Sequence, residues 1–385
     1  MKRSLTHLSL LLLLAAPLTL RAQIVNLTFP AGSPEDQASQ AVDKETDAAK
    51  RTALLNDFVQ KFAANPMAVA YGNSQMAQQL AASGDAAGAL AASEKAYAAV
   101  PNNFEIIMTA ANSAQQAKNW GKVVEYGAKG GTLFNAIGKQ KPAEMSDADF
   151  ANQSQAQRQQ FQQQYDFLEA SAFNAMGQES SAKARMGEID AFTGAFPKSK
   201  FSESLAQLAI YSLSELKDSA GLAAYADKAV AANPDSVATL AMLANAFSEE
   251  QSGAHLVKAT EYAHRAIELA NNNKDKSDAN VLLAAGLAHY ALGYALLRQD
   301  GITAPRPGPR ASTAIAELKL ASGMLKSNPA ADASALYWLG SACAKGAKFD
   351  EAQSALTDAA AIPGPYQQPA RDLLAKVNSA RSKAR

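Results

Sequence analysis

A helical pattern that recurs along most of the sequence is the feature that most constrains the fold of this chain. Ala70 to Asn103 contains an apolar helical stretch, a Gly84-Asp85 turn, a second helix with alanines at two spaced positions, and a terminating proline. Ala333 to Tyr366 has the same plan, with Tyr337-Trp338-Leu339-Gly340 in its first helix. The repeating unit is a helix-turn-helix of about 34 residues. Each such pair buries its apolar face only against its neighbours, so the pattern predicts an array of pairs.

Weaker copies of the same unit fill most of the chain. They are Phe104 to Ile137, Glu203 to Ser236, Val237 to Asn271 and Ala279 to Pro329, and Gln163 to Pro197 is a more degenerate pair. Glycine at a helix end or crossing permits positive φ or close approach, alanines let helices touch, and proline ends the second helix. With abundant alanine and few strand-like stretches, the sequence predicts an all-α protein.

The two clearest units resemble the tetratricopeptide repeat (TPR). An aromatic residue followed by Leu339-Gly340 marks the first helix, and the alanine pairs Ala89 and Ala96, or Ala352 and Ala359, mark close contacts of the second. The opening aromatic is missing in most copies. The resemblance, to exported bacterial members of the family, implies a right-handed α-solenoid of stacked antiparallel helix pairs with capping helices at both ends.

The predicted organisation follows the repeats. It consists of a signal peptide (1–22), N-terminal capping helices (23–69), TPR-like repeats (70–137), an extended irregular repeat with a Gln-rich helix (138–202), further TPR-like repeats (203–278), a repeat with a Pro-rich loop at 298–312 (279–332), a TPR repeat (333–366) and a C-terminal capping helix (367–385). Within the first cap, Ser33-Pro34-Glu35-Asp36 has the proline and early acids typical of a helix start.

The N-terminus has the pattern of a secretory signal. Met1-Lys2-Arg3 is followed by an apolar run from Leu8 through Ala16, and we expect cleavage after Ala22. An uncleaved anchor is the alternative. No cysteine lies near this junction to accept a lipid. We therefore expect a periplasmic or secreted product with no membrane span after cleavage.

Charge and cysteine content exclude several classes of protein. Lys plus Arg number 36 and Asp plus Glu number 36, so no net positive charge attracts nucleic acid. The single cysteine, Cys343, allows no internal disulfide.

No motif for catalysis, a metal or a cofactor is present in the sequence. After loss of the signal peptide the histidines are His255, His264 and His289, and none has a metal-ligand pattern. Asn271 to Asp278 lacks the glycine and closing glutamate of a calcium loop. We predict that the chain is not an enzyme, and a hydrolase whose acids leave no sequence signature is the alternative of another class.

Binding is the function that remains, and the repeat resemblance places it on the concave face lined by the first helices. The side chains expected there are Tyr71, Gln78, Asn112, Gln115, Gln207, Tyr211, Asn245, Tyr290, Tyr337 and Ser341. Amides and tyrosines can hydrogen-bond a peptide backbone, which favours a scaffold for a protein or peptide partner. The alternative is an accessory or carbohydrate-binding component of an envelope enzyme or polysaccharide-assembly system, with Tyr211, Tyr290 and Tyr337 stacking on sugars.

One carboxylate-binding subclass of the resembled family is disfavoured. It uses lysine and asparagine on one repeat and asparagine on the next. In this chain Ser74, Gln78 and Thr109 stand at those positions. Without the lysine there is no charge-assisted hydrogen bond to a terminal carboxylate.

Overall fold

The computed structural model describes residues 24–275, 277–302 and 306–384. These described residues form 17 helices and no strand, which confirms the all-α class. The chain divides into two compact units, the first ending at Ala172 and the second beginning at Phe173. The predicted signal peptide lies outside the described residues.

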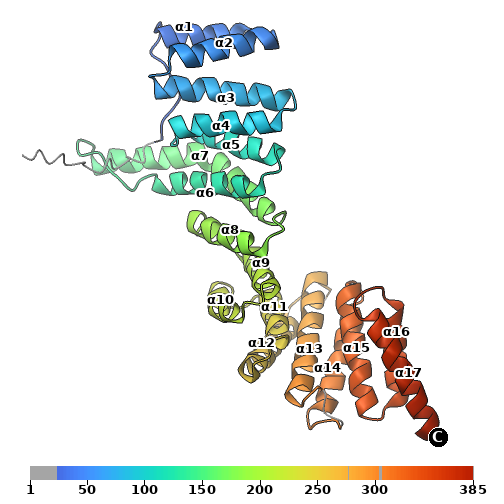
Figure 1. Cartoon of the computed structure of the whole chain (residues 1–385). Coiled ribbons are helices and arrows are strands. Elements are labelled where there is room, and N and C mark those ends of the chain that lie inside the picture. Colours follow the sequence, from blue (N-terminus) through green and yellow to red (C-terminus); the bar gives the residue numbers. More distant parts are fainter. Residues whose placement is uncertain (1–23, 276, 303–305, 385) are drawn as a thin grey trace, which may run out of the picture. The chain divides into compact units, whose positions relative to one another are not determined.

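Unit 1 is a stack of helices in which consecutive helices pack side by side and run antiparallel (Figure 1). Its helices are α1 (Pro34–Lys44), α2 (Ala48–Lys61), α3 (Pro66–Ala82), α4 (Ala86–Ala99), α5 (Phe104–Gln116), α6 (Trp120–Ala136) and the part of α7 (Asp147–Met176) before Phe173. α3 also contacts α5, so the first helices of consecutive pairs are neighbours. The glutamine-rich stretch lies within α7, which is 30 residues long.

Unit 2 continues from the last residues of α7 with pairs of the same kind. Its helices are α8 (Ala182–Ala195), α9 (Ser202–Glu215), α10 (Ser219–Ala232), α11 (Val237–Ser248), α12 (Gly253–Asn272), α13 (Ala279–Gln299), α14 (Ala311–Met324), α15 (Pro329–Lys345), α16 (Phe349–Ala361) and α17 (Gln367–Ala384). α11 contacts α13 and α13 contacts α15, again joining first helices of consecutive pairs. Each unit is therefore a segment of α-solenoid.

The turn inside a pair has one geometry that recurs along the chain. A residue with positive φ occupies it: Gly84 (φ 85°), Lys118 (53°), Lys217 (53°) and Ala347 (54°). The amide of the next residue donates back into the preceding helix, from Asp85 to Leu80, Asn119 to Ala114, Asp218 to Leu213 and Lys348 to Cys343. This is the left-handed helix stop that satisfies orphan carbonyls. Asp85, Asn119 and Asp218 then cap the following helix through their side chains. The recurrence of one turn shows the repeat in the backbone itself.

The Pro-rich loop is shorter than the sequence predicted. We expected it to span 298–312, but Arg298 and Gln299 belong to α13, and Ala311 begins α14. The last turn of α13 is held because Arg298 Nη1 donates to the carbonyl of Ser248 at 2.6 Å, and Gln299 Nε2 donates to that of Leu256 at 3.2 Å. Residues 303–305 lie outside the described part.

α13 is the one helix of the described residues that is long and apolar enough to cross a membrane. Two thirds of its apolar stretch (67%) is buried inside the protein, where it packs against α11, α12 and α14. His289 lies in that stretch, with Nδ1 2.5 Å from Glu317 Oε2 on α14. Burial against other helices accounts for its apolar composition.

Candidate functional site

A groove between α3 and α5 collects polar side chains from the first helices of two consecutive pairs. It encloses about 400 Å³ and is lined by Ala77, Gln78, Ala81, Ala82, Thr109, Asn112, Ser113 and Gln116. On each helix these residues recur at the spacing of one helical face. We call this hollow the α3–α5 groove. It places two of the predicted residues, Gln78 and Asn112, at one site.

The groove has an apolar floor and amides that are free to bind. Gln78, Asn112 and Gln116 are exposed. Within the described part of the chain, no protein group is hydrogen-bonded to their side-chain amides. Alanines supply the surface between them. Each amide offers two donors and one acceptor, which can pair with the N–H and C=O groups of a peptide backbone.

Two other predicted residues of unit 1 lie outside this groove. Gln115 is exposed on α5. Tyr71 is half-buried and packs against aromatic rings, and its part in binding stays a prediction. Its ring centroid lies 5.7 Å from that of Phe29 and 5.4 Å from that of Phe58, and its hydroxyl donates to Asp43 Oδ1 at 2.8 Å. Burial and the hydrogen bond to Asp43 raise the pKa of Tyr71. These contacts of the Tyr71 side chain connect α3 to α1 and to the segment before α1.

The predicted residues of the first pairs in unit 2 are accessible to different degrees. Tyr211 on α9 is 57% exposed, whereas Gln207 on α9 and Asn245 on α11 are half-buried. The Tyr211 ring centroid lies 5.5 Å from the Arg185 guanidinium, close enough for a cation–π contact. Tyr211 is the exposed tyrosine among those predicted to bind a ligand.

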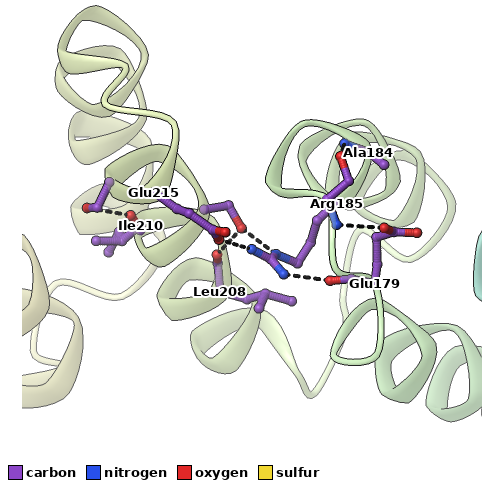
Figure 2. Close-up of polar contacts among 9 residues, drawn as sticks. Glu179, Ala184, Arg185, Leu208, Ile210 and Glu215 are labelled. Atoms are coloured by element: carbon purple, nitrogen blue, oxygen red, sulfur yellow. Dashed lines mark hydrogen bonds and ion pairs between the residues drawn. The ribbon is translucent and has the colours of Figure 1, made fainter. Parts of the chain in front are cut away.

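Arg185, for which no sequence pattern indicates a role, organises the contact between α8 and α9 (Figure 2). Its side chain is nearly buried, at 6% exposed. Nε donates to Ser212 Oγ at 2.7 Å, Nη1 to the carbonyl of Glu179 at 2.7 Å, and Nη2 to Glu215 Oε2 at 2.6 Å. A buried guanidinium bonded on all three nitrogens holds two helices together. This arrangement is structural and supplies no reacting group.

Glu188 lies one helical turn after Arg185 on α8, near the charges of Arg185 and Glu179. Its Oε2 is a buried atom with no hydrogen-bond partner among the described residues. Burial raises the pKa of Glu188 to about 7, with a further increase from Glu179 and a decrease from Arg185. The carboxyl is therefore partly protonated near neutral pH.

The remaining predicted residues lie among the aromatic rings of α13 and α15. Tyr290 is 5% exposed and stacks on Tyr294, with ring centroids 5.8 Å apart, so its predicted role on an open face is wrong. α13 has α11, α12, α14 and α15 as neighbours, and this crowding covers the ring. Tyr337 is half-buried and packs on Trp338 and Tyr366, each at 5.0 Å. Ser341 is half-buried.

The side chains considered as metal ligands or catalytic groups do not cluster among the described residues. Within the residues that the structure describes, no three His, Cys, Asp or Glu side chains group in a way that could hold a metal ion. Cys343 is fully buried, and burial raises the pKa of its thiol to about 11, so it is protonated at neutral pH. A protonated, buried thiol is a poor nucleophile.

Comparison with known proteins finds similarity in solved structures only. No family model matches the chain, and no curated protein matches it. Among 47 similar chains of solved structures are the TPR domain of P58(IPK) (13% identity, 92% of this chain and 99% of that chain covered, TM-score 0.30) and yeast Tom70 (12%, 90% and 95%, 0.27). Another is the APC/C hetero-tetramer Cut9–Hcn1 (13%, 91% and 91%, 0.24). Because these scores are low, the TPR-like fold rests on the helix pairs and recurring turns described above.

Proposed function

We propose that this chain is an exported scaffold that binds a protein or peptide partner through the exposed surface of its first helices and performs no catalysis. The observation that carries the proposal is the α3–α5 groove, where Gln78, Asn112 and Gln116 present unpaired amides above an alanine floor. A solenoid surface of this kind suits an elongated ligand, because adjacent pairs extend it. Amides fix the direction of a peptide backbone, and the alanines accept apolar side chains.

A peptide suits the site better than a glycan. The predicted sugar-stacking role needs open tyrosine faces, but Tyr290 is buried and Tyr337 packs against Trp338 and Tyr366. Tyr211 alone among those three tyrosines is exposed, and the Arg185 guanidinium lies near its ring. Of the three tyrosines on which the glycan-binding alternative was based, only Tyr211 therefore remains available for stacking on a sugar.

Export is supported by the basic start, apolar run and small residues of positions 1–22. The proposed compartment is the periplasm or the exterior of a bacterial cell. N-terminal sequencing of the chain recovered from the secreting cell should begin at Gln23. Recovery of the intact Met1 end in the membrane fraction would support the uncleaved anchor.

The test of binding uses a selected peptide and two matched double variants. A displayed random-peptide library is selected against the immobilised mature chain, and the affinity of the best peptide is measured by titration calorimetry. Gln78→Ala with Asn112→Ala removes two groove amides. Asn56→Ala with Gln60→Ala removes two exposed amides of α2 outside the groove and is the control.

We expect the groove variant to weaken binding about tenfold or more, which corresponds to about 1.4 kcal/mol, and the control to bind within about twofold of the unaltered chain. Equal affinities for all three proteins would rule out the groove as the site. Selection that succeeds only when envelope polysaccharide is added would favour the glycan-dependent alternative.

A further inference from the structure

The residues before α1 form an extended segment that lies on the body of unit 1. We call residues 24–30 the strap. The apolar side chains of Val25, Leu27 and Phe29 are partly buried, whereas Asn26 and Thr28 between them are exposed. This alternation is that of a β-strand with one face packed. Figure 1 shows the segment passing beside α3 and α4.

Two hydrogen bonds anchor the strap backbone to the loop between α4 and α5. The amide of Val25 donates to the carbonyl of Asn102 at 3.0 Å, and Asn103 Nδ2 donates to the carbonyl of Val25 at 2.7 Å. Asn103 is 4% exposed, and its Oδ1 accepts from the amide of Ile106 to cap α5. One buried asparagine thus starts a helix and holds an extended backbone.

The apolar strap residues enter two separate apolar clusters of the body. Val25 and Leu27 pack against the cluster built from Ala70, Ala96, Val100 and Ile106. Phe29 packs against a second cluster, formed by Phe58, Phe62 and Ala68 with Tyr71 beside them. Its ring centroid lies 6.0 Å from that of Phe58 and 5.7 Å from that of Tyr71. Backbone anchoring with sockets for alternate side chains is a recognised way of binding an extended peptide.

The strap does not fill the surface on which it lies. A hollow of about 410 Å³ beside it is lined by Ile24, Val25, Asn26, Leu27, Asn103, Phe104, Glu105, Met108, Gln160, Phe161 and Gln164. Gln164 Oε1 is buried and has no hydrogen-bond partner among the described residues. An unpaired buried acceptor is unfavourable, and a peptide N–H could satisfy it. The site therefore offers a ligand more contacts than the strap uses.

We propose that the strap is an intramolecular ligand covering a second docking site, and that this site takes an extended segment of a partner protein with apolar residues at alternate positions. The partner segment displaces the strap, takes over the bond to Asn103 and extends into the hollow beside Gln164. The strap, being tethered, competes at a high effective concentration, so only segments that use the additional contacts displace it readily. The site deepens the proposed protein-binding role but is separate from the α3–α5 groove.

The experiment compares the chain starting at Gln23 with one starting at Ala31, which lacks the strap. The probes are a fluorescent peptide with the sequence of residues 23–31, a peptide of unrelated sequence with the same alternation of apolar and polar residues, and a scrambled peptide that breaks the alternation. Circular dichroism and hydrogen exchange first establish that α3 to α6 are folded in both proteins. Binding is measured by fluorescence anisotropy and oligomeric state by light scattering.

We expect the strapless chain to bind both alternating peptides saturably and at least about tenfold more tightly than the full chain, and to ignore the scrambled peptide. A folded strapless chain that binds none of them, or all three equally, overturns the proposal. Dimers of the full chain that form by exchange of straps overturn it as well, because the occupant is then a second copy. Failure here leaves the Gln78 and Asn112 test of the groove unaffected.

If removal of the strap unfolds unit 1, the full chain with Leu27→Ser serves in its place. This variant keeps the strap attached but removes one apolar contact. Peptide binding at least severalfold tighter than that of the unaltered chain supports the proposal, and unchanged binding overturns it. The exposed change Thr28→Ser is the matched control.

Discussion

Gly340 lies so close to Leu356 that a Cβ atom on the glycine would be 2.5 Å from Leu356 Cγ. Both residues are buried, the glycine on α15 and the leucine on α16. Because Gly340 has no side chain, α16 can pack closely against α15. This close packing explains the glycine in the Leu339-Gly340 pattern.

Gly340→Ala should consequently destabilise unit 2. The added methyl must displace the fully buried Leu356 side chain, at a cost of about 1–3 kcal/mol, while the gain in helix propensity is about 1 kcal/mol. Gly323→Ala on α14 is the control, because nothing lies within 4 Å of the added Cβ. Chemical denaturation should show lower stability for Gly340→Ala and unchanged or higher stability for Gly323→Ala. The opposite order would contradict the packing.

The raised pKa of Glu188 predicts a pH-dependent contribution to stability. The pKa is about 7 in the folded chain, whereas the ordinary value for a glutamate is 4.5, so the folded state favours the protonated carboxyl. The stability contributed by that preference is complete below about pH 4.5 and is lost as pH rises through 7. Glu188→Gln, which cannot ionise, should therefore be more stable than the unaltered chain at pH 8 by about 1 kcal/mol, after allowing for partial exposure.

At pH 4 the two proteins should unfold at the same denaturant concentration. Glu261→Gln, a change at an exposed carboxylate of α12, is the control. A stability difference between Glu188→Gln and the unaltered chain that does not change from pH 4 to pH 8 would show that the burial of this carboxyl has no energetic consequence.

Removal of the C-terminal cap should loosen only the neighbouring helices. α17 packs on α15 and α16, and its Ala370 and Val377 are buried. Leu373 and Leu374 of α17 pack against the apolar core that these three helices share. Ending the chain before Gln367 removes these side chains, and a leucine or valine side chain is worth about 1.5–3 kcal/mol when fully buried. We expect α15 and α16 to lose hydrogen-exchange protection while α3 to α6 retain it.

Lys376→Ala, on an exposed position of α17, should leave the exchange pattern unchanged. Uniform loss of protection from one end of the truncated chain to the other would show a single cooperative domain instead of an array.

The fold could be predicted because the signals for it are local. Helix starts are marked by capping residues and by prolines such as Pro34 and Pro66. Recurring glycines and alanines mark the turns and the close helix crossings within each pair. The Gly84 turn is recognisable from sequence, but Lys118, Lys217 and Ala347 adopt the same positive φ without a glycine to announce it. The repeat pattern therefore predicts these three turns, whereas the residue type at the positive-φ position does not.

The site could be predicted only in part, because exposure depends on what else covers a helix. Gln78 and Asn112 line one groove, and their role in binding stays a prediction. Tyr71 is partly covered through contacts with Phe29 and Asp43, which are distant in sequence. Tyr290 is enclosed by several helices of unit 2. Arg185 was missed because one arginine on a helix gives no sign of its partners on the next.

Site-specific photocrosslinking in the cells that make the protein tests whether a partner lies in the α3–α5 groove. A benzophenone amino acid is placed at Gln78 or Asn112 in the groove, and at Ala91 on the exposed surface of α4 as the control. We expect an adduct of one size from both groove positions and none from Ala91. Adducts from Ala91 with none from Gln78 or Asn112 would contradict it.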